Sequence, residues 1–425
     1  MGSKLTILLP DSSSFMQILI SISALLVSVF LVQVSTGTLG PLDALSGLSI
    51  GFTRTEIGLI GSFHFVGFIL GCFLSPSLIK RVGHARTFSF VTGLSIIAVL
   101  LHPIWQNLYF WIVLRLFSGI AVAGAATVIE SWLHAKLNNE NRSKYFSFYR
   151  IFDMSGALVA QALIATLPVA QYWSYSLVAI FLCLSFLPLA LTKSVQPALP
   201  EHAKWRPFLA VSISPLAVAG VLVVGATGAA IRMVGPLFAF DSALTNSEIA
   251  LFLALFILGG ALSQLPVGYL ADKFTKRTIM MALSSLTIIV SFIMPLSFVS
   301  SLLGDKQIFI LVFIFGMATM PIYSLCATHA NDLCQTKDMT DLSASLIFFF
   351  AIGAIASPII SGALLDNFGP HILFIYFAAL HGLLLAFGLY RVIKRPVIHF
   401  ARPYIYIPRT SLFIAKTVKS FSRTK

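Results

Sequence analysis

Apolar stretches of about twenty residues recur along almost the whole chain, and short segments with charged residues, glycine or proline separate them. A helix needs roughly 20 apolar residues to cross the hydrocarbon core of a bilayer. The strands of a membrane β-barrel would instead show about ten residues of alternating polarity. The pattern therefore predicts an all-α membrane protein with twelve transmembrane helices. We expect these helices at residues 16–42, 56–79, 87–103, 108–134, 145–167, 172–192, 210–240, 246–271, 277–300, 307–330, 341–365 and 370–393.

The segment between the sixth and seventh predicted helices differs from the spans because it combines prolines with charged residues. We interpret residues 193–209 as a cytoplasmic linker between an N-terminal six-helix bundle at 1–192 and a C-terminal six-helix bundle at 210–395. The halves also echo each other, since Gly40-Pro41-Leu42 late in the first span recurs as Gly235-Pro236-Leu237 late in the seventh. Parallel repeats of this kind predict two pseudo-symmetric six-helix bundles.

Hydrophobic residues make up 58% of the 425 residues and charged residues only 10%, which excludes a soluble domain because its surface has to meet water. The net charge of +13 does not indicate a nucleic-acid partner, because Lys and Arg gather in the connections on one side of the predicted membrane. Cytoplasmic loops carry this excess, so we expect a bacterial inner-membrane protein with both termini in the cytoplasm. The basic, aromatic-rich tail at 396–425 either lies on the anionic inner leaflet or only sets the topology.

The sequence shows no signature of a metal, cofactor or nucleotide site. Its four cysteines fall in or beside apolar spans without metal-ligand spacing, and we expect them to pack as small apolar residues. A Gly-x-x-x-x-Gly-Lys-Ser/Thr phosphate loop is absent. Energy for transport would therefore come from a gradient, and we expect a monomer in the lipid bilayer with no cofactor and no metal.

Two motifs carry a resemblance to a known family. Gly268-Tyr-Leu-Ala-Asp272-Lys-Phe-Thr-Lys276-Arg277 follows the eighth predicted span, and Arg115-Leu-Phe-Ser-Gly119 lies in the fourth. Both resemble signatures of the major facilitator superfamily (MFS), and the resemblance covers the chain end to end through its twelve spans, linker and repeat. Within that superfamily, Glu130-Ser131 and Asn367-Phe-Gly-Pro-His-Ile-Leu-Phe374 resemble a bacterial branch typified by YcaD, whose substrate is poorly defined.

The resemblance implies a secondary active transporter, not an enzyme, whose two halves rock about a central site. It assigns a gating role to two cytoplasmic loop motifs, made of Lys80, Arg81, Gly83 and Arg86 in the first half and Gly268, Asp272, Lys273 and Arg277 in the second. The chain departs from the family pattern where Lys80 replaces the usual acid. Its fifth span also lacks the Gly-Pro pair of many proton-driven drug exporters, which weakens an assignment as a drug antiporter.

Three polar residues in apolar spans are candidates for contacting substrate. Arg115 matches the family's cavity-facing arginine and can hold an anionic group, with an interhelical hydrogen bond to a backbone carbonyl as the structural alternative. Arg232 precedes the second Gly-Pro, at the kind of kink that binds substrate in discontinuous helices. Its structural alternative is an ion pair with Asp43 or Asp241. Gln33 in the first span is the third candidate.

Two acids in apolar spans are candidates for proton coupling, because a carboxyl group at such a site can take up and release a proton during a transport cycle. Glu130 is the first candidate, and a latch to Arg81 or Arg86 is its structural alternative. Asp153 is the second, and its alternative is a pair with Arg150 one turn earlier on the same helix.

We therefore expect a transporter that moves a small organic solute across the cytoplasmic membrane by alternating access, coupled to protons. A proton-driven multidrug or metabolite exporter is the alternative within the same class. An integral-membrane enzyme acting on lipid substrates is the alternative from another class, but its one candidate cluster lacks metal-ligand partners or a second acidic motif. That cluster consists of His329, Asn331 and Asp332.

Overall fold

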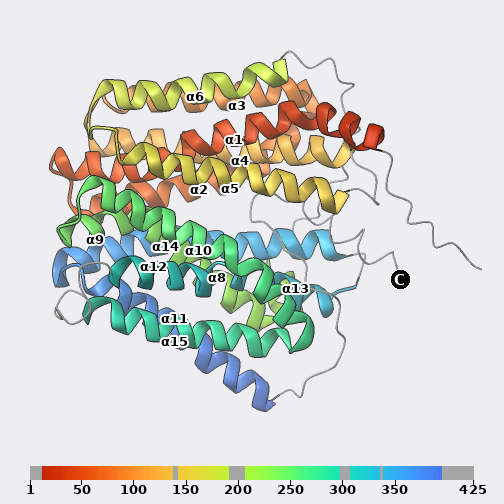
Figure 1. Cartoon of the computed structure of the whole chain (residues 1–425), viewed down its shortest axis with the longest axis vertical. Helices are drawn as coiled ribbons and strands as arrows, with labels where there is room; N and C mark the ends of the chain where they lie inside the picture. The colour runs from red at the N-terminus through yellow and green to blue at the C-terminus, as the bar shows by residue number, and fades with distance from the viewer. Residues whose placement is uncertain (1–11, 137–141, 191–205, 297–306, 336–337, 395–425) are drawn as a thin grey trace, which may run out of the picture.

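The computed structural model describes residues 12–136, 142–190, 206–296, 307–335 and 338–394. Regular structure in these ranges is helical throughout, as expected where a bilayer offers no water to backbone amides and carbonyls. The upper lobe of Figure 1 contains α1 (Ser12–Ser49), α2 (Arg54–Val82), α3 (His84–Leu101), α4 (Leu108–Lys136), α5 (Arg142–Ile164) and α6 (Tyr172–Ala190). The lower lobe contains α7 (Leu209–Ile213), α8 (Pro215–Met233), α9 (Gly235–Asp241), α10 (Asn246–Lys273), α11 (Lys276–Leu296), α12 (Gln307–Thr319), α13 (Ile322–Asp332), α14 (Met339–Phe368) and α15 (Ile372–Lys394).

The two lobes repeat one packing pattern. In the first lobe α1 packs against α5 and α6, α2 packs against α4, and α3 packs against α4 and α6. In the second lobe α8 packs against α14 and α15, α10 packs against α12, and α11 packs against α12 and α15. The helix contacts of the second lobe match those of the first when α7, α8 and α9 together are treated as the equivalent of α1. In the same comparison, the pair α12–α13 is the equivalent of α4. The lobes are therefore the two pseudo-symmetric six-helix bundles that the sequence predicted.

Eleven stretches of the described chain are long and apolar enough to cross a membrane, with α12 and α13 counted as one crossing. The expected fifth span, α5, falls outside this set because its first half carries Arg142, Lys144, Arg150 and Asp153. It still packs along α1 and also meets α10 of the other lobe, so it occupies the place of the twelfth crossing helix. The chain is a multi-pass membrane protein.

The first described helix begins and the last one ends on the same side of the bundle, on the right in Figure 1. We call this side the near face, and we call the opposite side, which holds the turns at 50–53, 165–171 and 242–245, the far face. The linker at 193–209, except for residues 206–209, and the tail at 396–425 lie outside the described residues.

Equivalent helices begin with the same cap at the far face. The Thr53 hydroxyl accepts a hydrogen bond from the Glu56 amide while the Glu56 carboxylate accepts one from the Thr53 amide, and Thr245 and Glu248 do the same ahead of α10. Each of these capping boxes satisfies two amides that the first turn of a helix leaves without partners. The Thr-x-x-Glu spacing therefore sets the start of the second helix in each lobe.

The Gly-Pro repeat has different consequences in the two lobes. Pro41 lies inside a continuous α1, which runs on from the predicted end at residue 42 to Ser49. In the second lobe the chain breaks at Val234, and Gly235-Pro236 opens the short α9. Proline removes an amide donor and crowds the preceding turn, so the predicted kink beside Arg232 is present.

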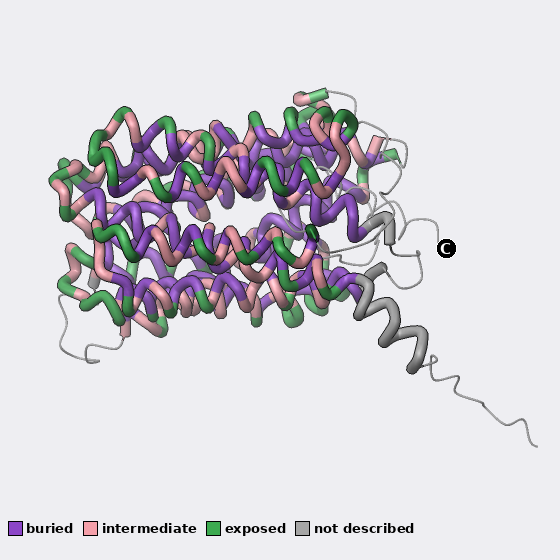
Figure 2. Tube along the Cα trace, turned by 90° about the horizontal axis from the view of Figure 1, so that it is seen from above, coloured by how far each residue is buried: buried purple, intermediate pink, exposed green. Residues whose placement is uncertain are grey.

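The hydrophobic core is shared at the far end and divided at the near end. One buried cluster joins α1 and α2 of the first lobe to α8 and α9 of the second through residues such as Leu42, Ile57 and Met233. Two further clusters lie toward the near face, one made of first-lobe residues and the other centred in the second lobe. Figure 2 shows the buried residues inside the bundle and the exposed ones along its outside, where side chains such as Leu265 and Leu383 would meet lipid.

The lobes approach each other most closely where α2 meets α14. A Cβ atom at Gly58 would lie 2.7 Å from the carbonyl carbon of Pro358, and one at Gly362 would lie 2.9 Å from the carbonyl carbon of Arg54. Small residues let helix backbones pack this closely inside a membrane. Both contacts lie near the far face, which keeps the lobes together there.

Candidate functional site

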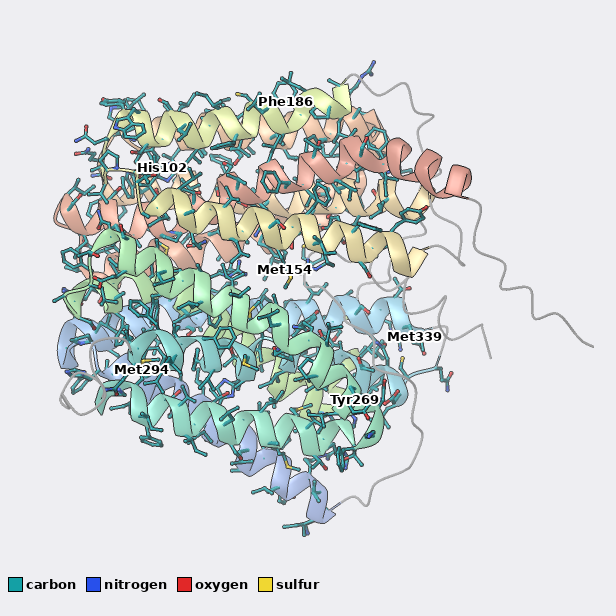
Figure 3. All side chains as sticks on the ribbon, viewed as in Figure 1. His102, Met154, Phe186, Tyr269, Met294 and Met339 are labelled. Atoms are coloured by element: carbon teal, nitrogen blue, oxygen red, sulfur yellow. The ribbon has the colours of Figure 1, made fainter. Side chains whose placement is uncertain are left out.

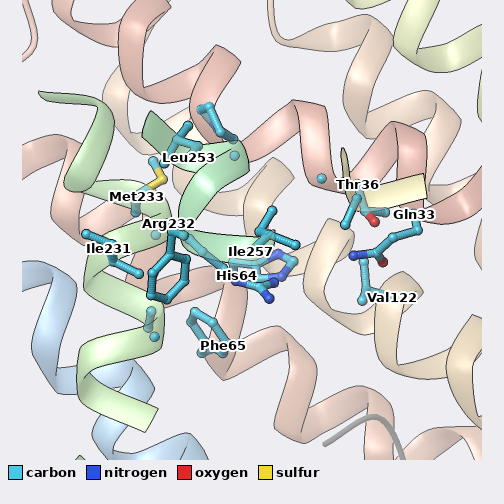
Figure 4. A pocket seen from close by; sticks show the side chains of 18 of the residues that line it. Gln33, Thr36, His64, Phe65, Val122, Ile231, Arg232, Met233, Leu253 and Ile257 are labelled. Atoms are coloured by element: carbon cyan, nitrogen blue, oxygen red, sulfur yellow. The ribbon is translucent and has the colours of Figure 1, made fainter. Parts of the chain in front are cut away.

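A cavity of about 250 Å³ lies between the two lobes. Residues of α1, α2, α4 and α5 form one wall, and residues of α8, α10, α14 and the turn before α13 form the other. Figure 4 shows Gln33 and Thr36 on one side and Arg232 on the other. The lining extends from Arg115, about two turns from the far end of α4, to Asp153 at the middle of α5. Two of the three predicted substrate residues, Gln33 and Arg232, therefore face each other across the interface between the lobes.

Arg115, the third candidate, forms a buried ion pair at the far end of the cavity. Its Nε lies 2.7 Å from Oδ2 of Asp43 on α1, and the two side chains are only 4% and 0% exposed. Its Nη2 donates to the backbone carbonyl of Leu39 at 3.0 Å, which is the kind of interhelical bond expected as the structural alternative. The same nitrogen lies 3.9 Å from Sδ of Met233 on α8. Arg115 therefore connects the interior of the first lobe to the wall of the second.

The ring of His102 lies beside this ion pair. His102, at the far end of the upper lobe in Figure 3, places Nδ1 2.6 Å from the Ala98 carbonyl oxygen and Nε2 3.1 Å from Oδ2 of Asp43. A carbonyl oxygen only accepts, so Nδ1 must carry a hydrogen. A second hydrogen, on Nε2 or on Oδ2, would make this contact attractive, because two lone pairs would otherwise face each other. The Tyr175 hydroxyl donates to the other carboxylate oxygen of Asp43 at 2.9 Å.

The equivalent place in the second lobe is aromatic in the described chain. Alignment of the two Gly-Pro pairs matches Asp43 with Phe238. The Phe238 ring packs on Phe374 and Phe252, with centroid distances of 4.9 and 5.9 Å. The buried ionic cluster is thus a feature in which the otherwise similar lobes differ.

Arg232 lies in the last turn of α8, and its side chain is exposed on the cavity wall. In Figure 4 it extends from α8 toward His64, whose ring lies on α2. The two acids that the sequence suggested as its partners contact other arginines, since Asp43 pairs with Arg115 and Asp241 pairs with Arg54.

The two predicted proton residues occupy different environments. Asp153 lines the cavity and pairs with Arg150 through an Nη1–Oδ2 contact of 2.9 Å, which is the alternative expected from their i, i+3 spacing. Glu130 is fully buried, accepts a hydrogen bond of 3.0 Å from the Tyr149 hydroxyl and lies outside the described cavity lining. Of the two predicted candidates, Asp153 is the one that a cavity solute could reach.

The near-face loop motifs lie apart from the cavity. Lys80, Arg81 and Arg86, where α2 meets α3, are exposed, and so are Asp272 and Lys273 at the end of α10. Gly83 has a φ of 86°, which favours glycine, and Gly268 is buried. Arg277 is half-buried, and its neighbour Lys276 forms a buried ion pair of 2.8 Å with Asp332 on α13. This pair joins α11 to α13 and occupies one acid of the cluster considered for an enzyme.

Ion pairs and capping contacts join the lobes at the far face. Arg54 on α2 approaches Asp241 on α9 with two contacts, Nε–Oδ2 at 2.7 Å and Nη2–Oδ1 at 2.5 Å. Its Nη1 lies 3.7 Å from Oδ1 of Asp366 on α14. Asp366 also accepts hydrogen bonds from the backbone amides of Arg54 and Thr55. The start of α2 is thus held by two acids of the opposite lobe.

The roles of Asp43, His102 and Tyr175 were not predicted from the sequence. The first span was predicted to end at residue 42, and Asp43 therefore looked like an acid at the rim. The signal that was available was Asp43 directly after Gly40-Pro41-Leu42 with further apolar residues following. His102 and Tyr175 come from separate spans, and only the packing of α3 and α6 brings them to α1.

Groups of three or more His, Cys, Asp or Glu residues able to hold a metal ion do not occur in the described part of the chain. His329, Asn331 and Asp332 lie together at the end of α13, and Asp332 contacts Lys276. The arrangement is that of an ion-paired helix end.

Comparison with known proteins gives the same result for both halves of the chain. The family model described as Major Facilitator Superfamily matches residues 20–243 and again residues 216–418. An uncharacterised MFS-type transporter of Enterobacter sp. (strain 638) is 23% identical over 326 residues, which cover 76% of this chain and 83% of that protein. The uncharacterised MFS-type transporter YcaD of Escherichia coli O17:K52:H18 is 23% identical over 331 residues, with the same coverage.

Solved structures support the fold. The crystal structure of the nucleoside transporter NupG superposes with a TM-score of 0.72 at 12% identity and covers 88% of this chain and 98% of that chain. A bacterial homologue of the human lysosomal transporter Spinster, in an inward-facing and occupied conformation, gives 0.66 at 14% identity and covers 98% of both chains. The matched repeats, the paired six-helix lobes and the cavity between them agree: the chain belongs to the major facilitator superfamily and is a membrane transporter.

Proposed function

We propose that the protein is a secondary active transporter that moves a small organic solute across the cytoplasmic membrane by alternating access, coupled to protons. In this proposal the near face, where the described chain begins and ends, is cytoplasmic, as the distribution of Lys and Arg predicts. The single observation that carries the proposal is the cavity between the lobes. Ion pairs that join the lobes at the far face support it.

The contacts between the lobes suit reversible opening. Arg54 and its partners Asp241 and Asp366 are partly exposed, at 30%, 11% and 25%, so water can replace these contacts when the lobes separate. Partly exposed ion pairs contribute little net stability. The buried cores toward the near face belong to separate lobes. Rocking of the lobes would therefore break the far-face contacts and expose the cavity on that side.

Proton coupling has its best support at the Asp43–His102 contact, which the sequence-based candidates did not include. The groups facing Asp43 are His102 after α3, Arg115 from α4 and Tyr175 from α6. In this proposal Nε2 of His102 and Oδ2 of Asp43 share a proton. Loss of that proton would leave a ring nitrogen and a carboxylate oxygen in repulsive contact, and Arg115 would then be the remaining cation beside Asp43. Because Arg115 also contacts Met233, a change in its position would reach the second lobe. Asp153 and Glu130 are the competing proton sites.

The test uses purified protein in liposomes that contain a pH-sensitive dye. A panel of small organic solutes is added one at a time, and proton movement driven by each solute is recorded. We expect at least one solute to drive proton flux, and we expect Asp43→Asn to abolish that flux while exchange of labelled solute across the membrane continues. The sign of the flux separates uptake from a proton-driven multidrug or metabolite exporter.

The same assay decides among the proton sites. If Asp43→Asn retains coupled flux while Asp153→Asn or Glu130→Gln loses it, the coupling site is one of the two acids predicted from the sequence. Solute exchange that never responds to a pH gradient would remove proton coupling and leave facilitated transport.

A further inference from the structure

The wall of the cavity contains a buried side-chain amide with one unbonded polar atom. Gln161 on α5 is 4% exposed and belongs to the cavity lining. Its Nε2 donates to the backbone carbonyl of Ala157, one turn earlier, at 3.3 Å. Its Oε1 has no hydrogen-bond partner among the residues that the structure describes. A buried acceptor in this state is costly, because it has lost its hydrogen bonds to water without gaining others.

The backbone contact fixes the direction of this amide. The Ala157 carbonyl oxygen only accepts, so the amide nitrogen of Gln161, and not its oxygen, must face it. A rotation of the amide by a half turn would bring two oxygens together and lose the hydrogen bond. The open atom is therefore an acceptor, and the group that completes it must be an N–H or O–H donor.

The packing of α5 on α1 places Gln161 in the first-lobe wall. Asp153, Ala157 and Gln161 follow each other at intervals of four residues and all line the cavity, so they form one stripe of α5. A Cβ atom at Gly156 would lie 3.0 Å from the Cβ of Gln33 on α1. Gln161 comes five residues after Gly156, which is about 7–8 Å farther along the helix. A solute of that length would reach from Gln33 to Gln161.

The opposite wall offers this acceptor no donor from α10. This helix of the second lobe packs on α5, and the residues that it contributes to the cavity are Leu253, Phe256 and Ile257. Their side chains have no N–H or O–H groups. The apolar face of α10 can therefore contact the body of a solute but cannot satisfy Oε1.

The charged groups of the first-lobe wall already contact each other. Nε of Arg115 lies 2.7 Å from Oδ2 of Asp43, and Nη1 of Arg150 lies 2.9 Å from Oδ2 of Asp153. A cationic donor would find both of these carboxylates next to arginines. A neutral donor needs no counter-charge, and it fits this wall better.

From the open acceptor and its surroundings, we propose that Gln161 binds the transported solute, and that this solute is an uncharged molecule with an apolar body and one N–H or O–H donor held by Oε1. Phe65 and Phe68 of α2 and Phe350 of α14 also line the cavity and would contact the body. Apolar walls with few polar groups are typical of sites in which the polar groups set orientation and specificity. The inference rests on the proposed transport function in placing the solute in this cavity.

The test is calorimetric binding of paired probes to the purified full-length protein. The donor probes are 4-phenylbutyramide, with N–H groups, and 4-phenyl-1-butanol, with an O–H group. Their counterparts are N,N-dimethyl-4-phenylbutyramide and 4-phenylbutyl methyl ether, in which methyl groups replace the donor hydrogens. We expect at least one donor probe to bind at least about tenfold more tightly than its counterpart, because the methylated form leaves Oε1 buried without a partner. The pair that shows the preference identifies the donor as an amide or a hydroxyl.

Substitutions of Gln161 give the decisive comparison. Gln161→Met removes the acceptor at similar side-chain length and should abolish the donor preference, whereas Gln161→Glu keeps an oxygen there and should retain at least part of it. Gln264→Met is the matched control. Nε2 of Gln264 on α10 donates to the Gly260 carbonyl four residues earlier at 3.2 Å, but this residue lies outside the described cavity lining. Its substitution should leave the donor preference unchanged.

The melting temperature without solute separates binding from a structural role. Gln161→Met removes a buried acceptor that has no partner, so its melting temperature should equal or exceed that of the wild type. A melting temperature clearly below those of the wild type and Gln264→Met would assign Gln161 a role in holding α5 and would overturn the inference.

Three binding results would also overturn it: equal binding of each donor probe and its counterpart by the wild type, a donor preference that survives in Gln161→Met, or no binding of any of the probes. Failure of the proposed function looks different. Binding with the expected dependence on Gln161, but with no exchange of labelled probe across liposomes, would refute transport and leave the binding assignment standing.

Discussion

The buried pair between Asp43 and Arg115 allows a double-mutant test of the cluster. Asp43→Asn leaves the guanidinium of Arg115 buried without its carboxylate, and Arg115→Met leaves the carboxylate of Asp43 without its guanidinium. The double variant removes both charges. The introduced asparagine would then be able to donate its side-chain amide to Nε2 of a neutral His102 and to accept from the Tyr175 hydroxyl, while methionine fills the volume of the arginine stem.

The expected magnitudes follow from the burial of both side chains. Removal of one partner of a buried ion pair costs about 3–5 kcal/mol, whereas replacement of both by packed neutral groups is often close to neutral. For a folding unit of 150–250 residues, which is the size of one lobe, 1 kcal/mol corresponds to a change in melting temperature of roughly 2–4 °C. Each single variant should therefore melt roughly 6–20 °C lower than the wild type. The double variant should recover most of that loss.

The assay is thermal unfolding in detergent, followed by intrinsic fluorescence at one heating rate for all variants. Arg206→Gln serves as the control, because Arg206 is 49% exposed in its ion pair with Asp338 and such a pair contributes only about 0–1 kcal/mol. If the losses of the two single variants add up in the double variant to within about 0.5 kcal/mol, the two charges are not coupled. The cluster would then lose its place in the proton-coupling proposal.

Three further predictions concern the contacts between and within the lobes. Gly58→Ala should lengthen the distance between spin labels in the turns at 50–53 and 369–371, because a Cβ atom at residue 58 meets the backbone of α14. Gly93→Ala should leave that distance unchanged, because a Cβ atom at residue 93 has no atom within 4 Å. Equal distances in both variants would contradict closure of the far face by α2 and α14. Arg54→Gln should shift the same distance distribution toward longer values by removing contacts with two acids of the other lobe, and an unchanged distribution would show that these ion pairs do not hold the far face. Lys276→Met should lower the melting temperature by several degrees, because it removes the ammonium group that pairs with the carboxylate of Asp332. Lys273→Met, at an exposed position over the Tyr269 ring, should change the melting temperature by much less. Similar shifts in the two variants would rule out a stabilising role for the buried pair.

Helix positions were predictable because each span must supply its own apolar length. The predicted span at 108–134 corresponds to α4 at Leu108–Lys136, and the predicted span at 246–271 corresponds to α10 at Asn246–Lys273. The first span was less accurate because Gly40-Pro41 was taken as the end of the helix, although α1 continues through it. That error moved Asp43 from the interior of the bundle to its rim, and the ionic cluster was missed with it.

The sequence by itself determined the membrane class, the two repeated halves and the identity of the charged residues that lie in apolar surroundings. These features depend on composition and on local periodicity, and the cost of charge in lipid makes each such residue conspicuous. Only the tertiary structure decided which of these residues meet. Arg115 contacts Asp43 across 72 residues of chain, and Arg54 contacts Asp241 across 187. Such pairs form where packed helices bring distant segments together, because a buried charge is stable only beside a partner that the fold supplies.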